Sequence, residues 1–347
     1  MLKEIEITGF KSIQQTKLSL NKINVLIGAN GAGKSNFIDF FQLLVSLANQ
    51  RLQFYIGHSG GANSLLHYGI KITLQIAAQL RIETTEGDNI YGFNLSYAPV
   101  NRMIIEESIN FKPSIIGEES ALIDDKVMLD HIGNYRVFHF HDTSETAQMR
   151  SSCDINNNRV LLNDASNLAA ILYKLQQTQA PYYQRIIKTI RKISPFFDDF
   201  LLKPLTINPN EIQLRWRARN SDYEFGPHQL SDGTCRTIAL ITLLLQDEKD
   251  LPSLIILDEP ELGLHPYAIS LIAALIRSAS IYTQIILSTQ STNFLDEFEP
   301  EDVIVVEQRQ GKSLFKRLNM EQLSLWREDY TLSELWEKNV IGGSPSR

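Results

Sequence analysis

The sequence predicts an α/β fold with a core of parallel strands, an antiparallel β part and a helical middle region. Strand-like and helical segments alternate toward the C-terminal end of the 347 residues. The pattern of residues 23–28 predicts a buried strand that runs into a glycine-rich turn and an apolar helix. Over residues 71–97, β-branched and aromatic residues alternate with polar ones, which is typical of antiparallel hairpins.

The remaining elements follow from local patterns. A noisy alternation favours a strand over residues 2–10, and YRVFHFHD favours another over 135–142. The strand over 253–259 is apolar until its end, as the middle of a parallel sheet requires. The other predicted elements are helices over 36–48, 167–177, 182–193, 230–246 and 266–279, strands over 283–289 and 302–307, and a hairpin over 201–218 that turns at Asn208-Pro209-Asn210.

The composition is that of an ordinary globular protein and excludes several classes. The longest strongly apolar stretch, Ile238–Leu245, is far shorter than a membrane span, and MLKEIEITGF lacks the apolar core of a signal peptide. Cys153 and Cys235 form no C-x-x-C pair, so we expect no disulfide framework and a reducing cytoplasm. The net charge of -7 excludes a basic field over the whole protein, so nucleic acid would need a local basic face.

The motif GANGAGKS (Gly28–Ser35) matches the phosphate-binding pattern G-x-x-x-x-G-K-[ST]. Glycines let backbone N–H groups turn toward a β-phosphate, and the following helix directs the positive end of its dipole there. Lys34 would reach the β- and γ-phosphates, and the Ser35 hydroxyl would bind Mg²⁺. The residues expected to hold ATP are Asn30, Gly31, Ala32, Gly33, Lys34, Ser35 and Asn36.

Two carboxylates end the apolar strand LIILDE (Leu254–Glu259), at the edge where ligands bind in open α/β sheets. Asp258 would hold Mg²⁺ together with Ser35 and water. Glu259 would be the general base that polarises the attacking water. In isolation this strand end would be interpreted as two solvated acids, but together with the phosphate loop it predicts a hydrolytic nucleotide site.

A third motif, LSDGTCR (Leu230–Arg236), begins a long apolar helix. Ser231 and the backbone around Gly233 would offer a hydroxyl and N–H groups to a phosphate. A serine that caps the helix, followed by a glycine turn, is the better interpretation of this stretch in isolation. Both interpretations stay open from this stretch alone.

In this order the motifs resemble those of the ABC-type ATPases. The likeness is strongest to the RecF/SMC group and to the related AAA-type ATPases of phage-defence systems, which resemble the overcoming-lysogenisation-defect proteins. The resemblance covers most of the chain, and SDGT with ELGLHP makes it more specific than Walker A and B alone. The matching segments are Ile7–Ser12 (the opening GFKS strand), Gly28–Ser35 (Walker A), Leu230–Arg236 (signature), Leu254–Glu259 (Walker B), Glu261–Pro266 (the D-loop region) and the tail 332–345.

The resemblance implies an ABC-ATPase head, in which a P-loop parallel-sheet core carries an antiparallel β subdomain and a helical lobe or insertion. It divides the chain into an N-terminal ATPase lobe (1–100), a mixed or helical insertion (101–200) and a C-terminal ATPase lobe (201–347). The signature departs from the transporter-type LSGGQ, because SDGT stands in its place.

The strand after Walker B ends in STQS, where many ABC ATPases have a histidine that contacts the γ-phosphate. Gln290 stands at that position. An amide hydrogen-bonds phosphate or orients water, but it does not carry the charge of an imidazolium or shuttle a proton. We therefore expect Gln290 to be a γ-phosphate sensor with slow hydrolysis; a cap on the next helix is the alternative.

Family members use a sensing loop between Walker A and the signature to link the γ-phosphate to conformation. The candidates for the glutamine of this loop are Gln75 and Gln79.

Two further groups are less specific. His139 and His141 share one face of a predicted strand, but a metal site needs three or four converging ligands, and His131 is close only in sequence. A polar strand end is therefore the favoured interpretation. Arg185, Lys188 and Lys192 share one helical face, which would suit phosphate contacts or, equally, a solvated surface. Trp216 would suit stacking on a base or, equally, a place in the core.

By the same resemblance, two copies should sandwich two ATP molecules, with Ser231 and Gly233 of one copy touching the γ-phosphate held by Lys34 of the other. We expect a homodimer or a larger even-numbered oligomer that regulates a separate nuclease-like or toxin-like effector in anti-phage defence. The alternative is a RecF-like DNA-binding ATPase in repair. A membrane-transporter subunit is disfavoured by GFKS, SDGT and the insertion, so no membrane is expected.

Overall fold

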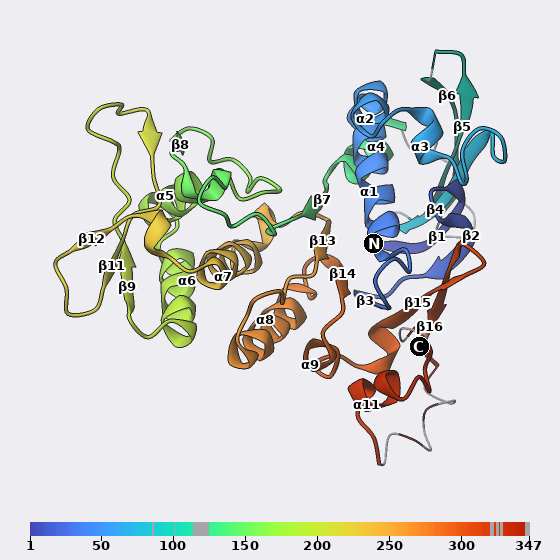
Figure 1. Cartoon of the computed structure of the whole chain (residues 1–347). Helices are drawn as coiled ribbons and strands as arrows, with labels where there is room; N and C mark the ends of the chain where they lie inside the picture. Colours follow the sequence, from blue (N-terminus) through green and yellow to red (C-terminus); the bar gives the residue numbers. More distant parts are fainter. Residues whose placement is uncertain are drawn as a thin grey trace. The chain divides into compact units, whose positions relative to one another are not determined.

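The computed structural model of the chain describes residues 1–84, 87–100, 102–113, 125–319, 323, 326 and 329–343. The chain forms two compact units, each built from segments that are distant in sequence (Figure 1). The first unit comprises Met1–Val137, Pro252–Ile256 and Gln284–Arg347, and the second comprises Phe138–Leu251 and Leu257–Thr283.

A six-stranded sheet in the order β16-β15-β3-β14-β13-β7 forms the centre of the first unit. β3 pairs in parallel with β14 and with β15, and β16 returns antiparallel to β15, so the predicted parallel core is confirmed. The strands are β3 (Ile23–Ile27), β7 (Tyr135–Phe138), β13 (Leu254–Asp258), β14 (Gln284–Thr289), β15 (Val303–Arg309) and β16 (Lys312–Arg317). The ends of β7 and β13 pass into the second unit.

An antiparallel sheet in the order β2-β1-β4-β5-β6 completes the β structure of the first unit. Its strands are β1 (Leu2–Phe10), β2 (Ile13–Ser19), β4 (Gln75–Glu83), β5 (Gly87–Ala98) and β6 (Arg102–Pro113). The alternation over residues 2–10 predicts β1 correctly, because Ile5 and Ile7 are fully buried on one face. The predicted hairpin region contains β4 and β5, whereas β6 is an additional strand along the free edge of β5.

Helix α1 (Lys34–Ala48) joins the two sheets through aromatic contacts. Phe40 meets Phe10 of β1 edge-on at 5.4 Å and stacks with Phe93 of β5, while Phe37 meets Phe315 of β16 at 5.2 Å. Rings of this size bury a large apolar area and set the position of the helix start. Further helices in the described part of this unit are α2 (Leu52–His58), α3 (Ala62–Leu65), α4 (Asp125–Gly133), α9 (Thr292–Leu295) and α11 (Leu332–Glu337).

The second unit is mainly helical. Its helices are α5 (Leu168–Thr178), α6 (Ala180–Ile193), α7 (Asp232–Leu244) and α8 (Pro266–Ala279). Pro181 lies in the first turn of α6, where its missing N–H leaves no helical bond unmade, so the predicted break between the two helices is confirmed. Among the described residues, no helix combines the length and the apolar character that crossing a bilayer requires.

Short strands cover part of the second unit. They are β8 (Cys153–Asp154) with β10 (Glu211–Ile212), and β9 (Phe197–Phe200) with β11 (Trp216–Ala218) and β12 (Glu224–Phe225). The arms of the predicted 201–218 hairpin do meet, since Leu205 N–H donates to the Glu211 carbonyl at 2.9 Å, but their strands pair mainly with other segments. Trp216 is 4% exposed and stacks on Phe225 at 4.4 Å, so it is a core residue.

Candidate nucleotide site

The glycine-rich loop leads directly from β3 into α1, in the context that the motif requires. Gly31 and Gly33 have φ values of 77° and 115°, which glycine adopts without strain. A Cβ on Gly31 would meet no described heavy atom within 4 Å, so the loop is open there. Ser35 is exposed in the first turn of α1. An open loop at a helix N-terminus with an exposed hydroxyl fits the phosphates of a nucleotide and its Mg²⁺.

Two serines that are distant in sequence brace this loop. Ser313 of β16 donates through Oγ to the Ala32 carbonyl at 2.7 Å and shares a hydrogen bond of 2.6 Å with Ser12 Oγ. Asn36 donates through Nδ2 to Ser12 Oγ at 2.6 Å, so its side chain supports the loop from the GFKS segment. A Cβ on Gly33 would lie 2.0 Å from Ser313 Oγ, so packing also requires this third glycine of the motif.

Lys34 lies against the carbonyl groups of its own loop. The side chain is 5% exposed, and Nζ donates to the carbonyl oxygens of Gly28 at 2.7 Å and Ala29 at 3.2 Å. Gly28 itself packs on β15, where a Cβ would be 2.2 Å from the Val306 carbonyl oxygen. The ammonium group is thus held at the loop. An anionic ligand bound there would replace the carbonyl oxygens as the acceptor of its hydrogen bonds.

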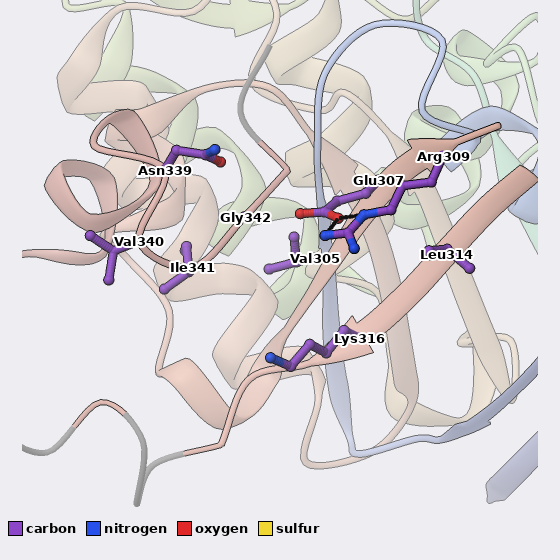
Figure 2. A pocket seen from close by; sticks show the side chains of 9 residues that line it. All are labelled: Val305, Glu307, Arg309, Leu314, Lys316, Asn339, Val340, Ile341 and Gly342. Carbon is purple, nitrogen blue, oxygen red and sulfur yellow. Dashed lines mark hydrogen bonds and ion pairs between the residues drawn. The ribbon is translucent and has the colours of Figure 1, made fainter. Parts of the chain in front are cut away.

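The C-terminal segment also contacts the loop. Ala29 N–H donates to the Gly343 carbonyl at 2.9 Å, and Gly343 N–H donates to Glu307 Oε1 at 2.9 Å. Figure 2 shows the pocket between β15, β16 and residues 339–342, with Glu307 paired to Arg309. The resemblance of the tail 332–345 to the family was the sequence feature that drew attention to this segment. Ser344 and Pro345 of the tail lie outside the described residues.

Gln290 lies at the same sheet edge as the loop. Thr289 of β14 pairs with Ile27 of β3 in parallel register, so Gln290 stands one step beyond the strand, beside the start of the loop. The cap of α9 is Ser291, whose Oγ accepts from Phe294 N–H at 3.2 Å. The alternative interpretation of Gln290 as a helix cap is therefore wrong.

The two candidate sensing glutamines lie elsewhere in the first unit. Gln75 and Gln79 are both on β4 of the antiparallel sheet, where Gln79 stands opposite Glu6 of β1 and Gly92 of β5. Neither is at the end of a parallel strand, which is where the phosphate loop and Gln290 are found.

In the second unit, the two carboxylates of Walker B begin a tight turn. Asp258 ends β13, and both carboxylates are half-buried. Glu259 has a φ of 42°, in the left-handed region that is uncommon for a glutamate. Leu262 N–H closes the turn by donating to the Glu259 carbonyl at 3.2 Å. Such conformations persist where the surrounding structure imposes them, and they cluster at functional sites.

The histidines of HFHD meet Asp258. β7 ends at Phe138, so the strand predicted over 135–142 is shorter than expected. His139 Nδ1 and His141 Nε2 lie 3.9 and 3.8 Å from Asp258 Oδ2, and this carboxylate raises the pKa of His141. Sequence reasoning missed the group because its third member is about 120 positions away along the chain. His131 is elsewhere, edge-on to Tyr135 in the first unit.

Arg236 of the signature motif binds both the HFHD segment and the turn that follows Walker B. It is 6% exposed and donates to the carbonyl oxygens of Phe140 at 2.8 Å and His141 at 3.2 Å. A third hydrogen bond goes to the Leu262 carbonyl in the ELGLHP segment. The planar guanidinium suits several acceptors at once, and it links the HFHD segment to the turn after Walker B.

At the start of α7, three residues of the SDGT sequence make contacts within their own chain. Ser231 is the N-cap and its Oγ accepts from Thr234 N–H at 3.2 Å, which confirms the capping interpretation. Asp232 pairs at 2.8 Å with Arg150, which is 4% exposed. A Cβ on Gly233 would lie 2.6 Å from the Gly263 carbonyl oxygen, so this glycine permits close packing of α7 on the ELGLHP segment.

The fold and these motifs define a P-loop protein with an ABC-type head. The chain belongs to the family described as "AAA domain, putative AbiEii toxin, Type IV TA system", whose model matches residues 23–296. Within the ABC-type ATPases it falls in the RecF/SMC-like group, as the sequence resemblance implied.

Three known proteins illustrate this likeness. Structural maintenance of chromosomes protein 3 of Arabidopsis thaliana is 38% identical over 71 residues, which are 20% of this chain and 6% of that protein. The DNA replication and repair protein RecF of Renibacterium salmoninarum is 40% identical over 52 residues, 15% of this chain and 13% of that protein. The SMC head crystallised with the C-winged helix domain of ScpA aligns with a TM-score of 0.65 at 15% identity, over 93% of this chain and 99% of that one.

Proposed function

We propose that the chain is an ABC-type ATPase head that binds ATP with Mg²⁺, hydrolyses it slowly and regulates a separate effector chain in the cytoplasm. The observation that carries the proposal is the open phosphate loop, with Lys34 held against it and Gln290 just beyond the end of the neighbouring strand β14. The toxin and Type IV system named in the family description support a role in bacterial anti-phage defence.

In this proposal, the loop residues from Asn30 to Asn36 bind the phosphates, and Ser35 and Asp258 hold Mg²⁺. Bound Mg²⁺ would neutralise charge on the phosphate oxygens. Glu259 takes a proton from the attacking water as general base, and Gln290 orients that water or the γ-phosphate. Because an amide does not shuttle protons as an imidazole does, hydrolysis is expected to be slow.

Ser231 and Gly233 would complete the site of a second copy in a nucleotide sandwich. Their contacts within one chain are compatible with this, because Ser231 is exposed at the start of α7. The related SMC head binds the C-winged helix domain of ScpA. By analogy, we propose that ATP-driven pairing of two heads changes the surface offered to a nuclease-like or toxin-like effector.

Light scattering of the purified protein tests this proposal directly. The mass is measured with and without ATP·Mg²⁺ for the wild type, Glu259→Gln and Lys34→Ala. We expect ATP to produce dimers or larger even-numbered assemblies, most strongly with Glu259→Gln because hydrolysis no longer resets them, and not at all with Lys34→Ala. A monomer that binds ATP in both the wild type and Glu259→Gln would refute the trans role of Ser231.

A RecF-like DNA-binding role is the second candidate, and one surface favours it. α6 buries Tyr183 and Ile187 while it exposes Arg185, Lys188 and Lys192 along its outer side. Reversal of these three charges should abolish salt-sensitive binding to duplex DNA while ATP binding persists. DNA affinity that does not change on charge reversal would exclude this surface.

A further inference from the structure

We propose that His139, His141 and Asp258 form a binding site for a divalent transition metal ion, with Zn²⁺ as the reference ion. All three belong to the second compact unit, so the site does not depend on the phosphate loop. One ligand atom from each side chain lies within 4.8 Å of the others, and all three side chains are half-buried.

The side chains converge on one oxygen. His139 Nδ1 is 3.9 Å and His141 Nε2 is 3.8 Å from Asp258 Oδ2, and the two imidazole rings lie side by side with centroids 6.3 Å apart. Phe140 between them is 5% exposed and packs on Phe138. Ligand atoms that lie about 2.1 Å from a tetrahedral ion are about 3.4 Å from one another. Side-chain rotations that move the ligand atoms by roughly 1 Å would therefore bring the three groups to bonding geometry.

One atom of the group lacks a hydrogen-bond partner among the described residues. His141 Nε2 is inaccessible to solvent and makes no hydrogen bond there. Its separation from the Asp258 carboxylate is too long for a hydrogen bond. A buried polar nitrogen without a hydrogen bond is unfavourable, and an ion between the imidazole and the carboxylate would bind this nitrogen directly.

The donor set selects the class of ion. Two imidazole nitrogens with one carboxylate oxygen suit Zn²⁺, Co²⁺ or Fe²⁺, whereas Mg²⁺ prefers oxygen ligands alone. The site therefore differs in chemistry from the proposed magnesium site, although Asp258 belongs to both. If the proposed function is correct, a transition metal at the histidines would compete with Mg²⁺ for Asp258 and inhibit hydrolysis.

The backbone of the site is held independently of its side chains. Arg236 binds the carbonyl oxygens of Phe140 and His141, and these acceptors are backbone atoms that a side-chain substitution leaves in place. Glutamine substitutions at His139 and His141 should therefore keep the segment in place. The exposed His228 of the same unit offers a matched histidine control.

The test is titration of the metal-free full-length chain with Zn²⁺ by calorimetry and with Co²⁺ by visible absorption, in the absence of nucleotide. The proteins are the wild type, His139→Gln, His141→Gln, His228→Gln and Lys34→Ala. We expect one ion per wild-type chain, with binding weakened at least about tenfold by either site substitution. His228→Gln and Lys34→Ala should bind like the wild type.

The outcomes separate this site from the nucleotide site. Wild-type chains that take up no Zn²⁺, or both site variants binding as tightly as the wild type, would overturn the metal site. Intact Zn²⁺ uptake in a protein that binds no ATP would refute the proposed function and leave the metal site standing. Loss of ATP binding in Lys34→Ala with full Zn²⁺ uptake would support both.

Discussion

Arg236 donates a hydrogen bond from Nε to the carbonyl oxygen of Phe140 at 2.8 Å. The two residues are 96 positions apart, and the bond joins the signature helix to the segment that carries both histidines. Through its other nitrogens the same guanidinium reaches the carbonyls of His141 and Leu262. One buried side chain thus orders the surroundings of Asp258 and Glu259.

Arg236→Ala should lower the free energy of unfolding by about 2–4 kcal/mol, because three carbonyl groups lose a charged donor. Urea unfolding followed by circular dichroism measures it. Arg185→Ala, an exposed arginine on α6, should change stability by less than about 0.5 kcal/mol. Equal midpoints for the two variants would show that the Arg236 hydrogen bonds contribute no net stability.

Gly233→Ala should destabilise the chain in the absence of nucleotide. The new Cβ would lie 2.6 Å from the Gly263 carbonyl oxygen, so α7 must shift, at a cost of about 1–3 kcal/mol. Ser231→Ala provides the comparison, since loss of the cap alone costs about 1 kcal/mol. If thermal unfolding of Gly233→Ala matches the wild type while ATP-driven pairing is lost, the glycine serves the partner's nucleotide rather than packing.

Gln290→His should raise the rate of ATP hydrolysis roughly tenfold, because an imidazole at the end of β14 can transfer protons. Steady-state phosphate release at saturating ATP gives the rate. Ser291→Ala is the matched control, as it removes the adjacent cap and leaves Gln290 in place. A rate that falls with Gln290→His, by as much as with Gln290→Ala, would mean that the amide itself is required.

Glu307→Ala should weaken ATP binding about threefold to tenfold, the equivalent of one lost hydrogen bond. The carboxylate accepts from Gly343 N–H, and the Gly343 carbonyl in turn accepts from Ala29 of the phosphate loop. Titration with a fluorescent ATP analogue measures the affinity. Arg309→Ala removes only the more exposed partner of the Glu307 ion pair and should have little effect. Equal affinities for the ATP analogue in the wild type, Glu307→Ala and Arg309→Ala would show that the C-terminal tail does not contribute to nucleotide binding.

His131 should make stability depend on pH in a defined window. Burial lowers its pKa from the ordinary 6.5 to about 4, so the unfolded chain binds a proton that the folded chain does not. Stability supplied by the neutral imidazole is present above pH 6.5 and is lost as the pH falls toward 4. The thermal midpoint of His131→Gln should therefore decline less over this window than that of the wild type. Parallel declines would show that other groups account for the acid sensitivity.

Some elements were predictable because their pattern is local. The helix predicted over 266–279 is α8 to the residue, since Pro266 marks its first turn and its buried positions recur with helical period. β14 follows from a short apolar run next to a polar turn. β6 and β16 were missed because their sequences are mixed, and the pairing with β5 and β15 stabilises them as strands.

The placement of the motif glycines, Lys34 and the two Walker B acids along the backbone could be predicted from the sequence, because spacing over a few residues is enough to set it. Which distant groups meet became apparent from the tertiary structure alone. It placed His139 and His141 at Asp258 and Gly343 at Ala29. Such contacts depend on how whole elements pack, and the local periodicity of a sequence does not encode which packed surfaces face each other.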